Sequence, residues 1–149
     1  MQINPLLSFD GHCEAAFKFY ERCLGGKIVF MLRYGEAPGS ESLAPGWRDK
    51  IIHATLALED RVLQGSDNTP ETYLKPQGFA ISLNIDAAEQ ADRIFSALAE
   101  NGVVQMPLQE TFWALRFGMV VDAFGTPWVI NCENPQAAAQ FAEKFGRSE

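Results

Sequence analysis

The sequence has few of the residues that most often mark a catalytic or metal site. It contains two histidines and three cysteines, which are Cys13, Cys23 and Cys132. An odd number of cysteines without framework spacing is typical of proteins of the reducing cytoplasm, so we expect a cytoplasmic location and inert thiols. The chain has no C-x-x-C pair, no phosphate-binding loop and no Ser-His-Asp order. The common zinc, nucleotide and hydrolase sites therefore have no signature here.

Positive charge is also scarce, because 12 Lys and Arg residues face 19 Asp and Glu, for a net charge of −7. Proteins that bind nucleic acid need clustered basic side chains to displace counterions from phosphates, and here the basic residues are scattered. We therefore expect no nucleic-acid partner. No apolar run approaches the roughly 18 residues of a membrane-spanning helix. The N-terminus also lacks a targeting pattern, so we expect no membrane partner.

What the sequence does contain is an internal repeat. Four residues of the first half recur at one constant spacing in the second half, each at an equivalent place in the expected order of elements. The matched pairs are Asp10 and Asp86, Ala15 and Ala91, Phe19 and Phe95, and Gly26 and Gly102. We interpret the chain as two copies of one structural unit.

The first unit, residues 1–67, is expected to run strand, helix and three strands. Apolar residues at helical spacing precede Gly25-Gly26, and glycine is common just past a helix end. A polar loop rich in Gly, Pro and Ser separates the second strand from the third. The expected elements are a strand at 3–9, a helix ending near Leu24, and strands at 27–34, 50–58 and 61–66.

The second unit, residues 78–134, repeats this order after a polar connector. Asp86 is the expected N-cap of its helix, with Glu89 completing a capping-box pattern. The expected strands are 79–85, 103–108, 113–121 and 127–132. A short amphipathic helix at 135–146 follows, and its apolar stripe must pack on the sheet or on a partner subunit. The fold class is thus α+β, a single domain over residues 1–149 made of two βαβββ modules.

Three segments carry a family resemblance. They are Phe9-Asp10-Gly11 leading into residues 14–20, then His53-Ala54-Thr55-Leu56, and residues 122–128. Together with the repeat they resemble the vicinal oxygen chelate superfamily, the fold of glyoxalase and bleomycin-resistance proteins, and within it the PhnB-like branch. The resemblance spans residues 3 to about 133. It implies that each unit curls a mixed sheet into a half-barrel, that the two form a cleft, and that the protein is a homodimer.

Catalytic members of this superfamily hold a divalent metal, and the resemblance allows that site to be tested. The usual ligands are a His or Gln on the first strand of each unit and a Glu on the last strand. The matching places here are near Ile3 and Phe79 on the first strands, and at Gln64 and Ile130 on the last. Only Gln64 has an atom that binds metals, so we predict no superfamily-type metal centre and no cofactor.

The branch is sometimes labelled as a demethylubiquinone methyltransferase, and the residues do not support that label. A methyl donor such as S-adenosylmethionine usually sits on a Gly-rich turn that begins a helix in a parallel sheet. The Gly-rich turn of this chain, Leu24-Gly25-Gly26, is expected to end a helix instead.

His53 is the candidate for catalysis, because an imidazole titrates near neutral pH and suits a general base or a contact to an anionic group. The alternative is a buried neutral histidine that is hydrogen-bonded to backbone. Gln64 and Ser66 alternate onto one face of their strand and are expected to supply polar ligand contacts. Trp113, Phe117 and Trp128 are expected to line the second half of the cleft. Their rings stack on a planar or cationic ligand, or else fill a core.

Four charged residues on the strands each allow two interpretations, a ligand contact or a solvated side chain. Arg33 and Arg116 lie in mid-strand and either hold a ligand carboxylate or point to solvent. Asp67 and Glu133 end matching strands, as carboxylates at the rim of the cleft or as solvated strand ends.

These observations favour a metal-free small-molecule-binding protein. The ligand would be apolar or aromatic, in the manner of resistance proteins that act by sequestering a drug. One alternative is a metal-dependent isomerase, lyase or dioxygenase with displaced ligands. The other is a structural or interaction module whose cleft is filled.

Overall fold

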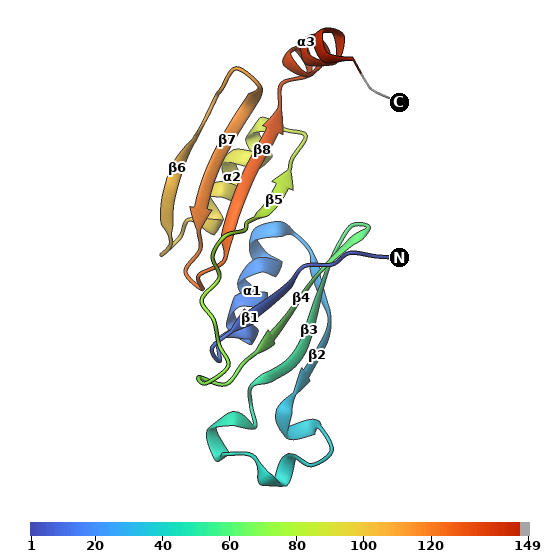
Figure 1. Cartoon of the computed structure of the whole chain (residues 1–149). Helices are drawn as coiled ribbons and strands as arrows, with labels where there is room; N and C mark the ends of the chain where they lie inside the picture. The colour runs from blue at the N-terminus through green and yellow to red at the C-terminus, as the bar shows by residue number, and fades with distance from the viewer. Residues whose placement is uncertain (147–149) are drawn as a thin grey trace. The chain divides into compact units, whose positions relative to one another are not determined.

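The computed structural model describes residues 1–146, which form two compact units (Figure 1). Unit 1 is Met1–Pro76, and unit 2 begins at Gln77. Each unit contains one four-stranded sheet. None of the described helices is both long and apolar enough to cross a membrane.

Unit 1 has the strand order β1-β4-β3-β2, in which β1 and β4 are parallel and the other neighbours are antiparallel. Helix α1 ends as expected at Gly25, which adopts the left-handed conformation with φ 75°. The loop between β2 and β3 contains three short 3-10 turns. The elements are β1 Leu6–Phe9, α1 Cys13–Leu24, β2 Lys27–Arg33, β3 Ile51–Leu58 and β4 Arg61–Asp67.

Unit 2 repeats this topology with the order β5-β8-β7-β6, again with one parallel pair, β5 and β8. The expected α+β fold of two βαβββ modules and a C-terminal helix is therefore confirmed. The elements are β5 Ile81–Asn84, α2 Ala88–Leu98, β6 Val103–Gln109, β7 Ala114–Val121, β8 Pro127–Glu133 and α3 Pro135–Phe145.

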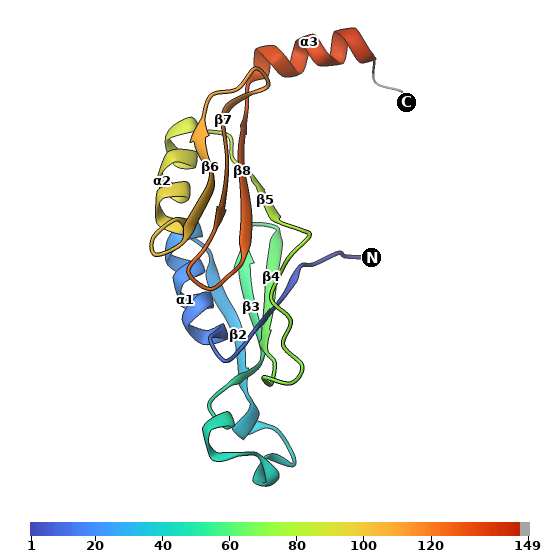
Figure 2. The ribbon, with the colours of Figure 1, turned by 60° about the vertical axis from the view of Figure 1, so that its left-hand side comes forward.

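In unit 1, α1 covers one face of the sheet (Figure 2). Strand β4 alternates between the two faces: Leu63, Gly65 and Asp67 are buried on the α1 side, while Gln64 and Ser66 point the other way. A side chain at residue 65 would overlap the helix, because its Cβ would lie 2.7 Å from Cζ of Phe17. Glycine at this position lets α1 approach the sheet closely.

In unit 2, α2 covers one face of its sheet in the same way (Figure 2). Strand β8 buries Trp128, Ile130 and Cys132, whereas Val129 and Asn131 alternate onto the opposite face. Gly118 allows the helix to pack closely here, since a Cβ at this position would lie 2.9 Å from Cε2 of Phe95.

Two boundary predictions were wrong. Asp86 does not cap α2, because the helix begins one residue later than expected and its N-cap is Ala87, which makes no side-chain cap bond. The first strand of each unit is shorter than expected, beginning at Leu6 and at Ile81. Ile3 therefore lies outside the sheet and is 90% exposed.

Candidate functional site

The helix-free face of unit 1, meaning the sheet face opposite α1, holds most of the polar candidates. Alternation along β4 and β3 places Gln64, Ser66, His53 and Thr55 on this face, because their neighbours in sequence pack against α1. Thr55 is directly opposite Gln64. The face is polar in its middle and apolar beside it. Its flanking side chains are Leu6, Phe30, Leu32 and Val62.

His53 is half-buried in this face and has two neighbours that fix its ring. Its Nε2 lies 3.3 Å from the hydroxyl of Thr55, and its ring centroid lies 5.9 Å from that of Phe30. This polar partner is a side chain of the same face, and the tautomer decides which of the two groups donates.

Ser8 is a member of this face that the sequence reading missed. Strand β1 runs parallel to β4, and the register puts Ser8 beside Ser66 and Leu6 beside Gln64. Leu7 and Phe9 are the buried positions of β1, so the residue between them faces the other way, and alternation along the strand could have found it.

Both interpretations given above for Asp67 were wrong, because this residue is neither a carboxylate at the rim of a cleft nor a solvated strand end. It is 1% exposed and faces α1. Its Oδ1 accepts hydrogen bonds from the backbone N–H groups of Gly11 and Cys13, both at 3.0 Å, and its Oδ2 accepts one from Ile51 at 2.8 Å. The carboxylate therefore caps the start of α1 and joins it to the start of β3. The alternation Leu63, Gly65, Asp67 pointed to this inward orientation.

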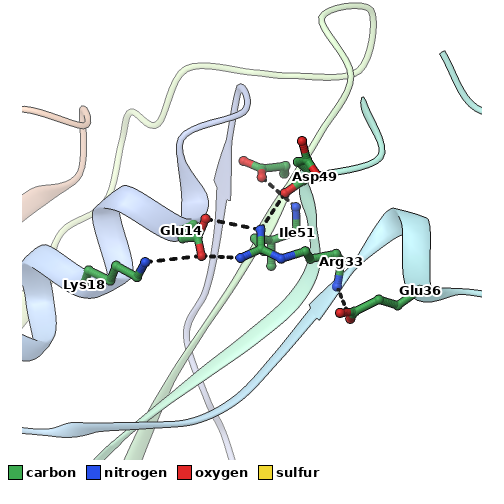
Figure 3. A network of polar contacts seen from close by, with 7 residues as sticks. Glu14, Lys18, Arg33, Glu36, Asp49 and Ile51 are labelled. Carbon is green, nitrogen blue, oxygen red and sulfur yellow. Dashed lines mark hydrogen bonds and ion pairs between the residues drawn. The ribbon is translucent and has the colours of Figure 1, made fainter. Parts of the chain in front are cut away.

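Arg33 binds a carboxylate of its own unit (Figure 3). Its Nη1 and Nη2 lie 3.2 and 2.5 Å from the two carboxylate oxygens of Glu14 on α1, and Nη1 also donates to the backbone oxygen of Asp49. The hydrogen bond from Arg33 lowers the pKa of Glu14 below its ordinary value, and the same bond raises the pKa of Arg33. The guanidinium thus ties β2 to α1.

Arg116 is paired in the same way. Its Nε donates to Oδ1 of Asp92 on α2 at 2.8 Å, and this hydrogen bond raises the pKa of the guanidinium. Arg33, at the end of β2, and Arg116, within β7, therefore each connect a sheet to its helix and have their carboxylate partners within the chain.

In unit 2 the structure separates the three aromatic candidates. Trp113 and Phe117 are in edge-to-face contact, with ring centroids 5.3 Å apart. Trp128 lies on the α2 side, is 1% exposed, and donates from Nε1 to Oδ2 of the buried Asp122 at 2.8 Å. The expectation that Trp128 shares a lining with Phe117 is corrected, because Phe117 pairs with Asn131 and Trp128 belongs to the opposite parity of β8.

An amide pair stands beside Phe117 on the face of unit 2 opposite α2. Asn131 donates from Nδ2 to Oδ1 of Asn84 at 3.1 Å, across the parallel β5–β8 register. Within the described residues, the Oδ1 atom of Asn131 is buried without a hydrogen-bond partner. The expected strand 79–85 included Asn84, but its pairing with Asn131 depends on the β5–β8 register, which the sequence pattern does not give.

These registers also revise the positions tested for a metal. The polar residues that the first and last strands turn away from the helices are Ser8, Gln64 and Ser66 in unit 1, and Ser82, Asn84, Asn131 and Glu133 in unit 2. Glu133 is the one carboxylate among them, and the others offer neutral hydroxyl and amide oxygens, which are poor ligands for Zn²⁺, Ni²⁺ or Fe²⁺. One carboxylate among neutral groups does not fit the metal of the catalytic relatives. Over residues 1–146, no group of three or more His, Cys, Asp or Glu side chains is arranged to hold a metal ion.

The duplicated βαβββ topology and the positions of these residues define a two-module protein of the glyoxalase type. Residues 2–130 match the model of the Glyoxalase/Bleomycin resistance protein/Dioxygenase superfamily, and the chain belongs to that family.

Comparison with individual proteins indicates the branch of the superfamily to which the chain is most similar. It is 36% identical over 144 residues to the protein YjdN of Escherichia coli strain K12, covering 91% of this chain and 98% of the relative. The crystal structure of protein PA1353 from Pseudomonas aeruginosa is 48% identical, with a TM-score of 0.82 and coverage of 89% and 98%. A PhnB protein from Bacillus cereus is 26% identical, with a TM-score of 0.72 and coverage of 89% and 99%. The resemblance to the PhnB-like branch is confirmed.

Proposed function

We propose that this chain is a metal-free small-molecule-binding protein whose ligand lies against the helix-free face of unit 1. The observation that carries the proposal is the polar centre of that face, where His53, Thr55, Gln64 and Ser66 lie among apolar side chains. A few directed hydrogen-bonding groups in an apolar surround are typical of small-molecule sites. In this proposal His53 and Gln64 orient the ligand, and Ser66 adds a hydroxyl.

The chemistry of the face favours a neutral, planar ligand. The side chains that surround His53 and Gln64 carry no fixed charge, while Arg33 is already paired with Glu14. Among residues 1–146, no Lys or Arg is paired across the strands with His53 or Gln64, so an anionic ligand would lie there without a fixed positive charge to offset its desolvation. Phe30, beside His53, supplies a ring face for stacking.

Trp113 and Phe117 form a second candidate contact surface, which lies in unit 2. We include them in the proposal as aromatic ligand contacts, and we leave out Trp128 because its ring is enclosed between β8 and α2.

The B. cereus PhnB protein is named as a proposed 3-demethylubiquinone-9 3-methyltransferase. We do not extend that activity to this chain. Here the Gly-rich turn ends α1, and each sheet has a single parallel pair of strands. The consecutive parallel crossovers that build the usual methyl-donor site are not part of this topology.

A binding titration with 2-naphthol, a neutral fluorescent aromatic with one hydroxyl, tests the proposal on protein treated with EDTA. We expect saturable binding that weakens roughly 10-fold in Gln64→Leu and in His53→Leu, since each variant leaves a ligand hydroxyl without its partner. Gln90→Leu, an exposed site on α2, is the matched control and should bind like the wild type. Binding that appears only with a divalent ion, one per chain, would instead support the metal-dependent enzyme.

We also propose a homodimer located in the cytoplasm. Dimers are common in this superfamily and closed two-fold pairs are the commonest assembly. The cysteine count is odd and all three side chains are buried, which supports a reducing compartment.

A further inference from the structure

Unit 2 carries a continuous series of aromatic rings, which we call the aromatic ladder. It begins at Phe117 on β7 and passes through Trp113 and Phe112 to Phe141 and Phe145 on α3. Successive ring centroids are 5.3, 4.7, 6.2 and 5.8 Å apart. Figure 1 shows α3 following directly from the end of β8. The ladder therefore joins the sheet of unit 2 to its C-terminal helix.

Four members of the ladder are exposed to an unusual degree. Phe112 is 75% exposed, Trp113 38%, Phe141 43% and Phe145 68%. With about 200 Å² for each aromatic side chain, the four present roughly 450 Å² of apolar surface. Contiguous patches on monomeric proteins seldom exceed a few hundred Å². A standard interface buries about 800 Å² on each partner, so the ladder alone supplies roughly half of one.

Helix α3 also leaves most of its apolar residues unburied. It has 11 residues, and Ala137 is its one buried residue. A helix of this length is marginal in water unless an apolar face packs against something. Its Phe141 ring contacts that of Phe112, which is itself 75% exposed.

The charges around the ladder indicate what covers it. Between residues 110 and 146 the basic residues are Arg116, which is paired with Asp92, and Lys144, whereas the acidic residues are Glu110, Asp122, Glu133 and Glu143. A helix that binds an anionic lipid surface or nucleic acid carries basic residues beside its apolar stripe. The ladder side chains themselves are uncharged, so an identical surface meets them without like-charge repulsion.

We propose that the outer part of the aromatic ladder, Phe112, Phe141 and Phe145, is the contact surface for a second copy of this chain, in an isologous pair in which these rings pack against each other. Trp113 and Phe117 are left to the ligand proposed above. This inference rests on the homodimer proposed above and adds the surface that forms it. Burial of Phe141 and Phe145 in the pair stabilises α3, and burial of Phe112 holds the ring beside Trp113.

Analytical ultracentrifugation of the full chain tests this inference. The double variant Phe141→Ser/Phe145→Ser and the single variant Phe112→Ser are compared with Leu74→Ser. Leu74 is also highly exposed but lies in unit 1, outside the ladder. We expect a wild-type dimer at micromolar concentration, a dissociation constant raised roughly 100-fold in the double variant, and an unchanged dimer in the Leu74 variant.

The outcomes separate the two proposals. A monomeric wild type would overturn both the homodimer and its surface. A dimer that persists unchanged in the double variant would overturn the ladder alone and leave the homodimer standing. The substituted side chains are exposed, so we expect the variants to fold, and far-UV circular dichroism checks this. If the double variant loses more helix than α3 contains, the test uses Phe112→Ser in its place. A dissociation constant of Phe112→Ser equal to that of the wild type would then contradict the inference.

Discussion

Replacement of Asp67 by Asn is expected to destabilise unit 1 strongly although it adds almost no volume. The carboxylate accepts three backbone N–H bonds in a site that is 1% exposed. The Asn amide has one oxygen where the carboxylate has two. In one orientation this oxygen accepts from Gly11 and Cys13, and in the other it accepts from Ile51. In either orientation the NH₂ group replaces the second oxygen and faces a backbone N–H, so two donors oppose each other.

The magnitude follows from these contacts. A hydrogen bond to a charged group contributes about 1.5–3 kcal/mol, and a buried donor left without a partner costs about 1–3 kcal/mol. Asp67→Asn loses one such bond and weakens the other two, so we expect a loss of about 3 kcal/mol. Asp67→Ala leaves all three donors unpaired and should cost more. Domains of this size have about 5–15 kcal/mol in total, so either change is severe.

Two measurements check this prediction. Urea denaturation gives the free energy of unfolding, with Asp10→Asn as the control, because Asp10 is the exposed neighbour of the same turn and should change stability by less than about 0.5 kcal/mol. Amide hydrogen exchange gives the local readout. We expect the N–H groups of Gly11, Cys13 and Ile51 to lose protection before the rest of the sheet. Stability equal to that of Asp10→Asn would refute the reasoning.

Three further predictions concern stability and thiol reactivity. Gly65→Ala should lower the free energy of unfolding, measured by urea denaturation, by about 1–3 kcal/mol, because the added methyl group overpacks against α1. Gly46→Ala is the control, with nothing within 4 Å of the added Cβ, and should lower it by less than about 0.5 kcal/mol. Equal losses in the two variants would contradict the packing account. The pKa of Glu14 is lowered by Arg33, so its stabilisation is present above its ordinary pKa of 4.5 and is lost as the pH falls through the lower folded value. Glu14→Gln should therefore lose about 0.5 kcal/mol at pH 7, and the difference should vanish in acid; a difference that grows in acid would reverse the sign. Burial raises the pKa of the Cys13 thiol, and all three cysteines are buried. A thiol reagent at pH 8 should therefore label the native protein only slowly, and should label all three thiols in denaturant. Rapid labelling of the native protein would contradict this prediction.

The fold was largely predictable from the sequence because each signal was local. Glycine past Leu24 marked the end of α1, and alternation marked the strands. The strand starts at Leu6 and Ile81 were harder to predict, because the apolar residues before them resemble strand positions while lying outside the sheet. Single positions in a strand then decide which side chains share a face.

The site was predictable only in part, for the same reason. His53, Gln64 and Ser66 fall on one face as alternation indicates. Trp128 does not join Phe117, because the cross-strand register decides which face each occupies, and register is a long-range property. Asp67 was misread because the type of a residue suggested solvent, whereas three unpaired backbone donors inside the unit required a buried acceptor.

The most direct test of the binding function is an amide chemical-shift map of EDTA-treated protein during titration with 2-naphthol. The largest changes should fall on His53, Thr55, Gln64 and Ser66, with saturation at one affinity and no requirement for a divalent ion. Changes confined to other faces of unit 1, or no saturable change until a metal is added, would contradict the proposed function.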